Sequence, residues 1–307
     1  MAICVYLDGC GDGSGAALRN ATMPYPVHVE VGPSHPQSNA GRARAAAMAL
    51  GLRVLEDREG LLFSTDADSL PASDWVTAGA AALECADVAA GRIVRQDGAA
   101  DRHQSRIERY YDRLHACRRR IDPVAWEARD THHFGGGANM VMRASTYRAL
   151  GGFRPLPSAE DATLLDDAAR AGFRVRRDAA MLVETSSRRD GRAADGLAEA
   201  LRALDGGVLP RVTHPDGVMW QAQAQALARR QFATIRDAAS RTVIGTAIGL
   251  SGDHVLGVAR DCPNAEAFAM RIVPAPPMHG RTVTLDEAED ALDALDALEG
   301  VMCEVAA

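Results

Sequence analysis

The sequence predicts an α/β fold with a mainly parallel central sheet, followed by a helical C-terminal region. Through about residue 185, short apolar segments alternate with alanine-rich segments, as strands and helices do in an α/β domain. Beyond about residue 190 the strand pattern ends, and apolar residues recur at helical spacing instead. The chain therefore divides into an α/β domain over residues 1–190 and a mainly helical region over residues 191–307.

The first elements follow from local composition. The segments AICVYL (2–7) and PVHVEV (26–31) are typical of strands, and a glycine-rich turn follows the first of them. NAGRARAAAMALG (39–51) predicts a helix, because alanine, arginine and methionine are strong helix formers. GLLFSTDAD (60–68) predicts a strand that runs into two acids, and Ser73 is expected to cap the helix after it.

Three later segments predict helices, namely DGLAEALRALDGG (195–207), MWQAQAQALARRQFATIRD (219–237) and TLDEAEDALDALDALEGVM (284–302). The proline-rich segment 273–280 is expected to be a linker before the last of them. That helix carries acids on one face, and its apolar face consists of Ala288, Ala291, Leu292, Leu295 and Leu298. We expect this helix to pack on its own domain. The alternative is that it pairs with a second subunit in a homodimer.

Composition excludes several classes of function. All 34 cationic side chains are arginine and 41 residues are acidic, so the net charge of −7 argues against a nucleic-acid partner. The six cysteines are scattered without a C-x-x-C pair, which favours reduced thiols in a cytoplasmic protein. No stretch approaches about 18 uninterrupted apolar residues, so no membrane span is expected.

Two acids, Asp66 and Asp68, stand one alanine apart at the end of a predicted strand. Like charges repel and lose hydration there, so a cation between them is expected. Because the carboxyl ends of parallel strands face the ligand crevice, the pair could hold Mg²⁺ or Mn²⁺ against a diphosphate. D-x-D is a common sequence, however, and the alternative is that Asp66 caps a turn while Asp68 lies in a solvated loop.

A second constellation spans residues 134–175, where a glycine-rich loop, a strand and a short helix precede Glu160 and Asp161 at the start of another helix. Ser158 and Asp161 fit a capping box, and acids in a first turn suit the helix dipole. A carboxylate at that position, beside the open end of the sheet, is also well placed to act as a general base.

Taken together, FSTDADSLP, GGANMVMRASTYRALGGF and EDATLLDDAARAGFRV resemble family 2 glycosyltransferases of the GT-A fold, from about residue 4 to about residue 190. Members of that family normally begin with a strand ending in proline and asparagine or glutamate, whereas this chain starts at what should be the second strand. The Q-x-x-R-W signature of processive members is also absent. The resemblance implies inverting, metal-dependent transfer of a single sugar from a nucleotide-diphosphate sugar to a hydroxyl acceptor.

The resemblance also implies a role for each candidate residue. Asp161 would deprotonate the acceptor hydroxyl, and Glu160 would contact the acceptor. Asp68 would be the principal ligand of Mg²⁺ or Mn²⁺, and Asp66 would contact the metal or the ribose. The other residues implied in donor binding are Asp8, Asn39, Gly41, Arg44, Gly136 and Gly137. The acceptor would be a glycan, a lipid or a small molecule, and a lipid would bring peripheral membrane contact.

Several alternatives stay open. The chain could be a non-catalytic GT-A-like binding module that has lost part of the nucleotide pocket. A sugar-phosphate nucleotidyltransferase is disfavoured, because the chain has no lysine for a triphosphate. Arg188, Arg189 and Arg192 would either hold the diphosphate or form a solvated basic loop. Adjacent residues His132 and His133 would point to opposite faces of a strand, so one of them is expected to be structural.

Overall fold

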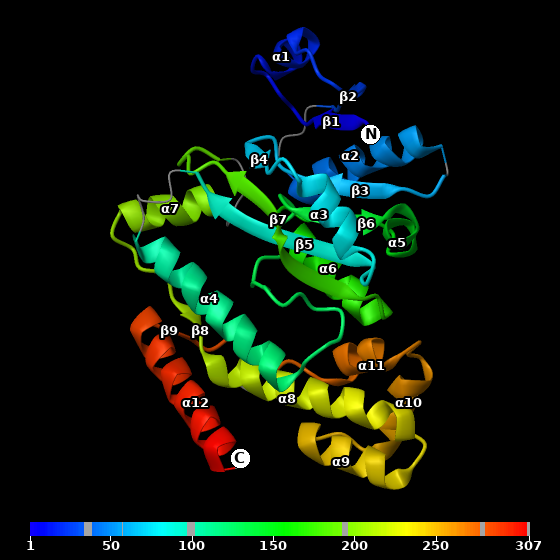
Figure 1. Ribbon diagram of the computed structural model, residues 1–307, viewed down its shortest axis with the longest axis vertical. Coiled ribbons are helices and arrows are strands. Elements are labelled where there is room, and N and C mark those ends of the chain that lie inside the picture. The colour runs from blue at the N-terminus through cyan, green and yellow to red at the C-terminus, as the bar shows by residue number, and fades with distance from the viewer. Residues whose placement is uncertain (34–38, 57, 97–101, 192–195, 277–279, 306–307) are drawn as a thin grey trace.

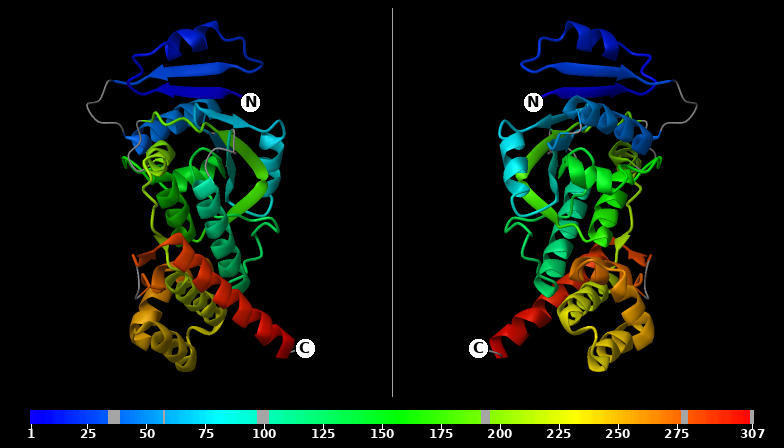
Figure 2. Two further views of the ribbon diagram at one scale, coloured as in Figure 1. Left: turned by 90° about the vertical axis from the view of Figure 1, so that its left-hand side faces the viewer. Right: turned by 90° about the vertical axis from the view of Figure 1, so that its right-hand side faces the viewer.

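The computed structural model of the chain describes residues 1–33, 39–56, 58–96, 102–191, 196–276 and 280–305. A two-stranded sheet, a five-stranded sheet flanked by helices and a helical C-terminal region follow one another along the long axis of the molecule (Figure 1). The side views in Figure 2 show the two-stranded sheet at one end and the C-terminal helices at the other. The predicted α/β class with a helical C-terminal region is therefore present, while the domain boundary near residue 190 stays a prediction.

The N-terminal unit forms a sheet of its own. Strands β1 (Ile3–Leu7) and β2 (Val27–Val31) lie parallel, with Ile3 opposite Val27. Helix α1 (Ser14–Asn20) lies in the crossover connection that joins these parallel strands. Helix α2 (Ala40–Leu55) packs against β1 and continues the chain to the central sheet. The two strands and the helix predicted over 39–51 are confirmed.

The central sheet is mixed. Its strands, in spatial order, are β3 (Leu61–Ser64), β6 (Met140–Arg143), β5 (Val88–Arg95), β7 (Val175–Thr185) and β4 (Ser69–Pro71). Only β5 and β7 run parallel, whereas the other three neighbouring pairs are antiparallel. The prediction of a mainly parallel sheet is wrong, because helix-separated apolar strands can enter a sheet in either direction without any change in their local pattern.

Helices cover both faces of this sheet. On one face, Trp75 at the start of α3 (Trp75–Ala82) packs with Val141 and Met181 in an apolar cluster. On the other face, Met48 of α2 and Leu164 of α6 (Glu160–Ala171) pack with other residues of β5 and β6. Burial on both faces explains the uninterrupted apolar residues Val88–Ala90 of β5 and Met140–Met142 of β6. Helix α3 starts after Asp74 without a side-chain cap, so the predicted cap at Ser73 is wrong.

Asn139 fixes the sheet just before the glycine-rich loop enters β6. Its side-chain Nδ2 donates to the carbonyl oxygens of Arg92 (2.8 Å) and Met181 (3.0 Å), and its Oδ1 accepts from Trp75 Nε1 (2.8 Å). A β-carbon on Gly91 would lie 2.3 Å from Asn139 Nδ2, so only glycine fits beside it. The middle parts of β5 and β7 are thereby held next to the loop that forms part of the candidate site.

The C-terminal region is helical, as predicted. Its elements are α7 (Leu197–Asp205), β8 (Val212–Thr213), α8 (Pro215–Gln231), a short 3-10 turn (Phe232–Thr234), α9 (Ala238–Ile248), α10 (Gly252–Arg260), α11 (Ala265–Ile272), β9 (Thr282–Val283) and α12 (Leu285–Val305). Part of the predicted linker, residues 277–279, lies outside the described residues. Within the described part of the chain no single helix is long and apolar enough to span a membrane, and α9 and α10 reach that length and composition only as a pair bent by 104°.

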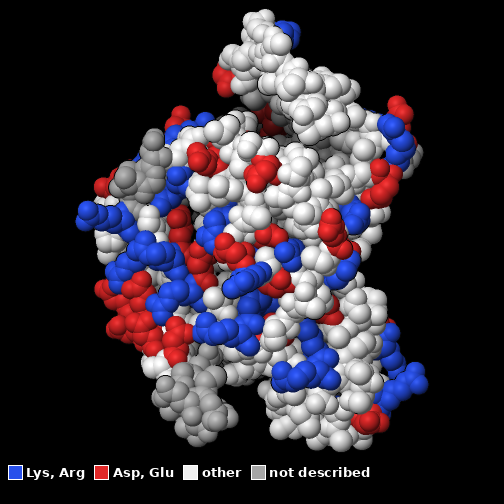
Figure 3. Space-filling view, in the orientation of Figure 1, with Lys and Arg blue, Asp and Glu red and all other residues white. Residues whose placement is uncertain are grey.

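The acidic face of α12 packs on α4 (Arg102–Ile121) of the same chain. Arg106 pairs with Asp286, and Arg113 pairs with Asp293 at 2.6 Å, seven residues further along both helices. Figure 3 shows acidic and basic side chains gathered side by side at the lower left, where α12 and α4 lie in Figure 1. Buried Leu292 completes the contact from its apolar face. The helix thus packs within its own chain, on α4 of the predicted α/β domain as well as on α8. The side chain of Leu298 lies outside the described residues, and a homodimer stays a prediction.

A buried group of charges lies where α4 meets the segment before β6. His132 is fully buried, and neither of its ring nitrogens has a hydrogen-bond partner among the described residues. Burial, with Arg92 and Arg177 nearby, lowers the pKa of His132 to about 3. Burial is also the largest cause that lowers the pKa of His115 to about 4, despite the nearby carboxylate of Glu127. Both imidazoles are therefore neutral in the folded protein at pH 7.

These two histidines predict a loss of stability in mild acid. In the unfolded chain a histidine titrates near pH 6.5, so below that pH the unfolded state binds more protons than the folded state. Lowering the pH from 7 to 5 is expected to cost about 2 kcal/mol for each histidine. In urea unfolding at the two pH values, His132→Phe should remove about half of this loss, whereas the exposed control His254→Gln should keep all of it. An unchanged pH dependence in His132→Phe would contradict the assignment.

Candidate functional site

The guanidinium group of Arg44, on the second turn of α2, joins three segments that are far apart in the sequence. Its Nη2 lies 2.9 Å from Asp66 Oδ1, just beyond β3, and its Nε lies 3.0 Å from Glu160 Oε1, at the start of α6. Its Nη1 donates to Ser64 Oγ and to the carbonyl oxygen of Gly137, both at 2.8 Å. One arginine thus brings the acids of both sequence constellations to the same place.

The packing around Arg44 leaves little freedom to its side chain. A β-carbon on Gly137 would lie 2.4 Å from Arg44 Cζ, so glycine makes the room that the guanidinium occupies. The cation also lies over the ring of Phe153, 5.7 Å from its centroid. Burial alone would lower the pKa of Arg44, but the carboxylates of Asp66 and Glu160 raise it above its ordinary value. The charge at this point is therefore permanent.

Asp161, the predicted base, lies at the second residue of α6 and points to the glycine-rich loop. Its Oδ2 accepts from the backbone N–H of Gly137 and its Oδ1 from that of Ala162, both at 2.7 Å. The predicted capping box with Ser158 is wrong, because the residue before the helix is Ala159, in a left-handed conformation with φ of 58° and no side-chain cap. An unbroken series of hydrogen bonds therefore connects Asp66 to Asp161 through Arg44 and Gly137.

Asp68 faces a different arginine. Its Oδ2 lies 3.0 Å from Nη2 of Arg188, in the loop after β7, and its backbone carbonyl accepts from the N–H of Ser186 at 3.1 Å. The positive charge expected between the two acids is thus supplied to each by its own arginine. Within the described residues, no group of three or more histidine, cysteine, aspartate or glutamate side chains is arranged to hold a metal ion.

The acids still fit one kind of metal. Mg²⁺ is usually bound by one or two carboxylates together with substrate phosphates and water, and dedicated all-protein cages for it are rare. Each arginine contact involves one oxygen of its carboxylate, Oδ1 in Asp66 and Oδ2 in Asp68. The residues therefore fit a Mg²⁺ or Mn²⁺ ion that a diphosphate helps to hold, and the protein alone would bind such an ion weakly.

Three residues that the resemblance assigns to donor or acceptor have local structural roles. The Asn39 side chain caps α2, and its Nδ2 donates to the carbonyl of Pro155 at 2.9 Å. A β-carbon on Gly41 would lie 1.9 Å from the carbonyl oxygen of Arg154, so α2 approaches that segment as closely as only glycine allows. Glu160 is only 4% exposed and faces Arg44. Ligand contacts by Asn39, Gly41 and Glu160 stay predictions.

The N-terminal unit reaches the same region through the loop after β1, which begins at Asp8. Residues Cys10, Gly11 and Asp12 of this loop line a cavity of about 290 Å³, and its other wall is Arg188, Asp190 and Gly191. Asp8 is partly buried at the start of this loop, and its predicted contact with a nucleotide base stays untested. Arg189 points elsewhere, to Asp205 at 2.8 Å, and Arg192 lies outside the described residues.

The histidine pair and the loop glycines complete the surroundings. His132 is buried whereas His133 is partly exposed, so one of the pair has a structural position, as expected. The segment is not a strand, however, and both rings lie against Phe134. His133 Nδ1 lies 2.8 Å from Asp112 Oδ1, and its ring stacks on Phe134 with centroids 4.1 Å apart. A β-carbon on Gly136 would lie 3.0 Å from Ile93 Cδ1 and, in ordinary contact, 3.8 Å from Asp161 Oδ2, so this part of the loop runs beside the carboxylate.

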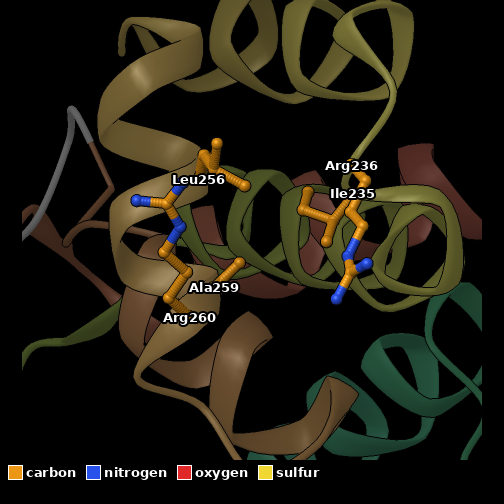
Figure 4. Close-up of a pocket in the computed structure, with 5 residues that line it drawn as sticks. All are labelled: Ile235, Arg236, Leu256, Ala259 and Arg260. Carbon is orange, nitrogen blue, oxygen red and sulfur yellow. The ribbon is translucent and has the colours of Figure 1, made fainter.

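A second cavity lies in the helical region, away from these residues. It measures about 400 Å³ and is lined by Ile235, Arg236, Leu256, Ala259 and Arg260 (Figure 4). None of these described lining residues is a candidate residue or carries a carboxylate, thiol or imidazole. The candidate residues that Arg44 joins therefore lie apart from this cavity.

Sequence reasoning missed Ser64 altogether. Its Oγ accepts from Arg44 and donates to the carbonyl of Gly137 at 2.7 Å, which ties β3 to the glycine-rich loop. Strand periodicity offered a signal, because Ser64 stands two residues before Asp66 and so on the same side of an extended chain.

No protein-family model matches the sequence, and a search of curated proteins finds no match. Among solved structures, the chain is similar to the mannosyltransferase PcManGT from Pyrobaculum calidifontis, in complex with GDP-Man and Mn²⁺. The two are 17% identical with a TM-score of 0.42, and the alignment covers 87% of this chain and 74% of that one.

Proposed function

We propose that this protein transfers a single sugar from a nucleotide-diphosphate sugar to a hydroxyl acceptor, with inversion of configuration and with the help of a divalent metal ion. The observation that supports the proposal is the series of hydrogen bonds from Asp66 through Arg44 and Gly137 to Asp161, which links the acid proposed to hold the metal to the acid proposed as the base. Metal dependence, inversion and the residue roles all belong to this proposal.

In the proposed reaction, Asp161 accepts the proton of the acceptor hydroxyl while the hydroxyl oxygen forms a bond to the anomeric carbon. The bond from that carbon to the diphosphate breaks on the opposite side, and the diphosphate leaves with the electron pair. The N–H groups of Gly137 and Ala162 orient the Asp161 carboxylate for this transfer. A metal ion bound at Asp66 and Asp68 would neutralise charge on the leaving group.

The first test is nucleotide binding by titration calorimetry. UDP, GDP, ADP, CDP and dTDP are titrated into the protein with Mn²⁺ and again with excess chelator. One of them is expected to bind with Mn²⁺, and Asp68→Asn should weaken that binding at least about tenfold by removing a carboxylate ligand of the metal. Asp74→Asn, at an exposed acid whose side chain caps nothing, is the matched control and should bind as the wild type does. Absence of metal-dependent binding for all five nucleotides would contradict the proposal and favour a non-catalytic module.

A further inference from the structure

The two arginines that face the predicted metal ligands are held very differently. The Arg44 side chain is 15% exposed and makes four polar contacts, two of them with carboxylates. The Arg188 side chain is 60% exposed, and its guanidinium has one ion pair in the described part of the chain, with the 30% exposed Asp68. The arginine at Asp66 is therefore fixed by its other contacts, although Asp66 itself is 41% exposed, whereas the arginine at Asp68 is held by a contact that solvent can reach.

An exposed ion pair of this kind is easily broken. Such pairs contribute about 0–1 kcal/mol in water, because solvation and side-chain freedom compensate for most of the attraction. Removing Arg44 from its place would instead leave the buried carboxylate of Glu160 without its partner. Arg188 is thus the arginine that can move to a ligand, and Arg44 is not.

The backbone keeps Arg188 close to Asp68 even when its side chain leaves. Strands β4 and β7 pair at Ser69 and Thr185, whose hydroxyl groups are also hydrogen-bonded at 3.0 Å. The N–H of Ser186 then holds the carbonyl of Asp68. The Arg188 side chain can therefore turn from the carboxylate without any change in the strands.

The cavity next to this ion pair favours an anion that brings its own cation. It is lined by Arg188 together with the acids Asp12 and Asp190. A diphosphate that entered alone would meet one arginine and several carboxylates, so its binding would be weak. A diphosphate accompanied by Mn²⁺ or Mg²⁺ would satisfy Asp68 with the metal and Arg188 with phosphate oxygens.

We infer that Arg188 is an exchangeable cap on Asp68: it pairs with the carboxylate in the donor-free protein and moves to the diphosphate when donor and metal bind together. The inference rests on the proposed function and goes further, because it names the residue that couples metal binding to donor binding. No bond is made or broken in this exchange, only ion pairs.

The test compares Arg188→Gln with Arg189→Gln, its neighbour in the same loop, which pairs with Asp205. Mn²⁺ binding without nucleotide is followed by electron paramagnetic resonance. It should become about 3- to 10-fold tighter in Arg188→Gln, because the competing cation is gone. Binding of the nucleotide diphosphate with Mn²⁺, measured by calorimetry, should become about 10- to 100-fold weaker through the loss of a charge-assisted hydrogen bond. Arg189→Gln should change neither quantity.

The outcomes separate this inference from the function on which it rests. Metal-dependent nucleotide binding by the wild type, unchanged in Arg188→Gln, would overturn the inference and leave the function standing. Weaker nucleotide binding without tighter Mn²⁺ binding would overturn the exchange, because Arg188 would then contact the phosphate without having capped Asp68. No nucleotide binding by the wild type would overturn the proposed function itself.

Discussion

Asp161→Asn is expected to lower the rate of sugar transfer by about 10³-fold or more, at the upper end of what a general base contributes. The amide keeps the shape of the side chain and still offers one oxygen to the N–H of Gly137, which now lies 2.7 Å from the carboxylate. It cannot accept the acceptor proton, because an amide is far less basic than a carboxylate. Transfer is measured as nucleoside diphosphate released from a panel of nucleotide sugars, with glycan and lipid fractions as acceptors.

The control for this substitution lies on the same helix. Asp166→Asn removes an exposed acid that pairs with Arg170 one turn along α6, and it should leave the rate unchanged. Nucleotide affinity should stay within about threefold of the wild-type value in both variants, since Asp161 is proposed to act on the acceptor and not on the donor. Near-normal transfer by purified Asp161→Asn would defeat its assignment as the base.

The local elements could be predicted from the sequence because each depends on neighbours in the chain. The helix over 39–51 follows from its alanine-rich composition, and the strand before Asp66 follows from its apolar run. The direction of the strands could not be predicted in this way. Strand β6 is antiparallel to both β3 and β5, and its apolar run would look the same in a parallel sheet.

The site was predictable as a set of residues but not as a set of contacts. Sequence reasoning singled out Arg44, Asp66 and Asp161 separately, and only the fold shows that one guanidinium and one glycine join them. Asp68 was expected to share a cation with Asp66. Its actual partner, Arg188, is 120 residues away in the chain, and such a pairing leaves no local pattern.

Arg44→Gln is expected to lower the free energy of unfolding by about 3–5 kcal/mol, the cost of breaking a buried ion pair from one side. Glutamine cannot reach Asp66, Glu160 and Gly137 at once, and Glu160, only 4% exposed, would keep a charge without a partner. Urea unfolding measures the change. The matched control is Arg170→Gln, which breaks an exposed pair with Asp166 and should cost less than about 1 kcal/mol.

A second substitution shows whether the unpaired carboxylate of Glu160 causes the loss of stability in Arg44→Gln. Adding Glu160→Gln to Arg44→Gln removes the unpaired carboxylate, so the double variant should be more stable than Arg44→Gln alone by about 1–3 kcal/mol. Nucleotide binding should not recover with stability, because Asp66 still lacks the arginine that orients it. If Arg44→Gln costs no more than Arg170→Gln, Arg44 is as exchangeable as Arg188. In that case the distinction between a fixed arginine at Asp66 and a movable one at Asp68 would not hold.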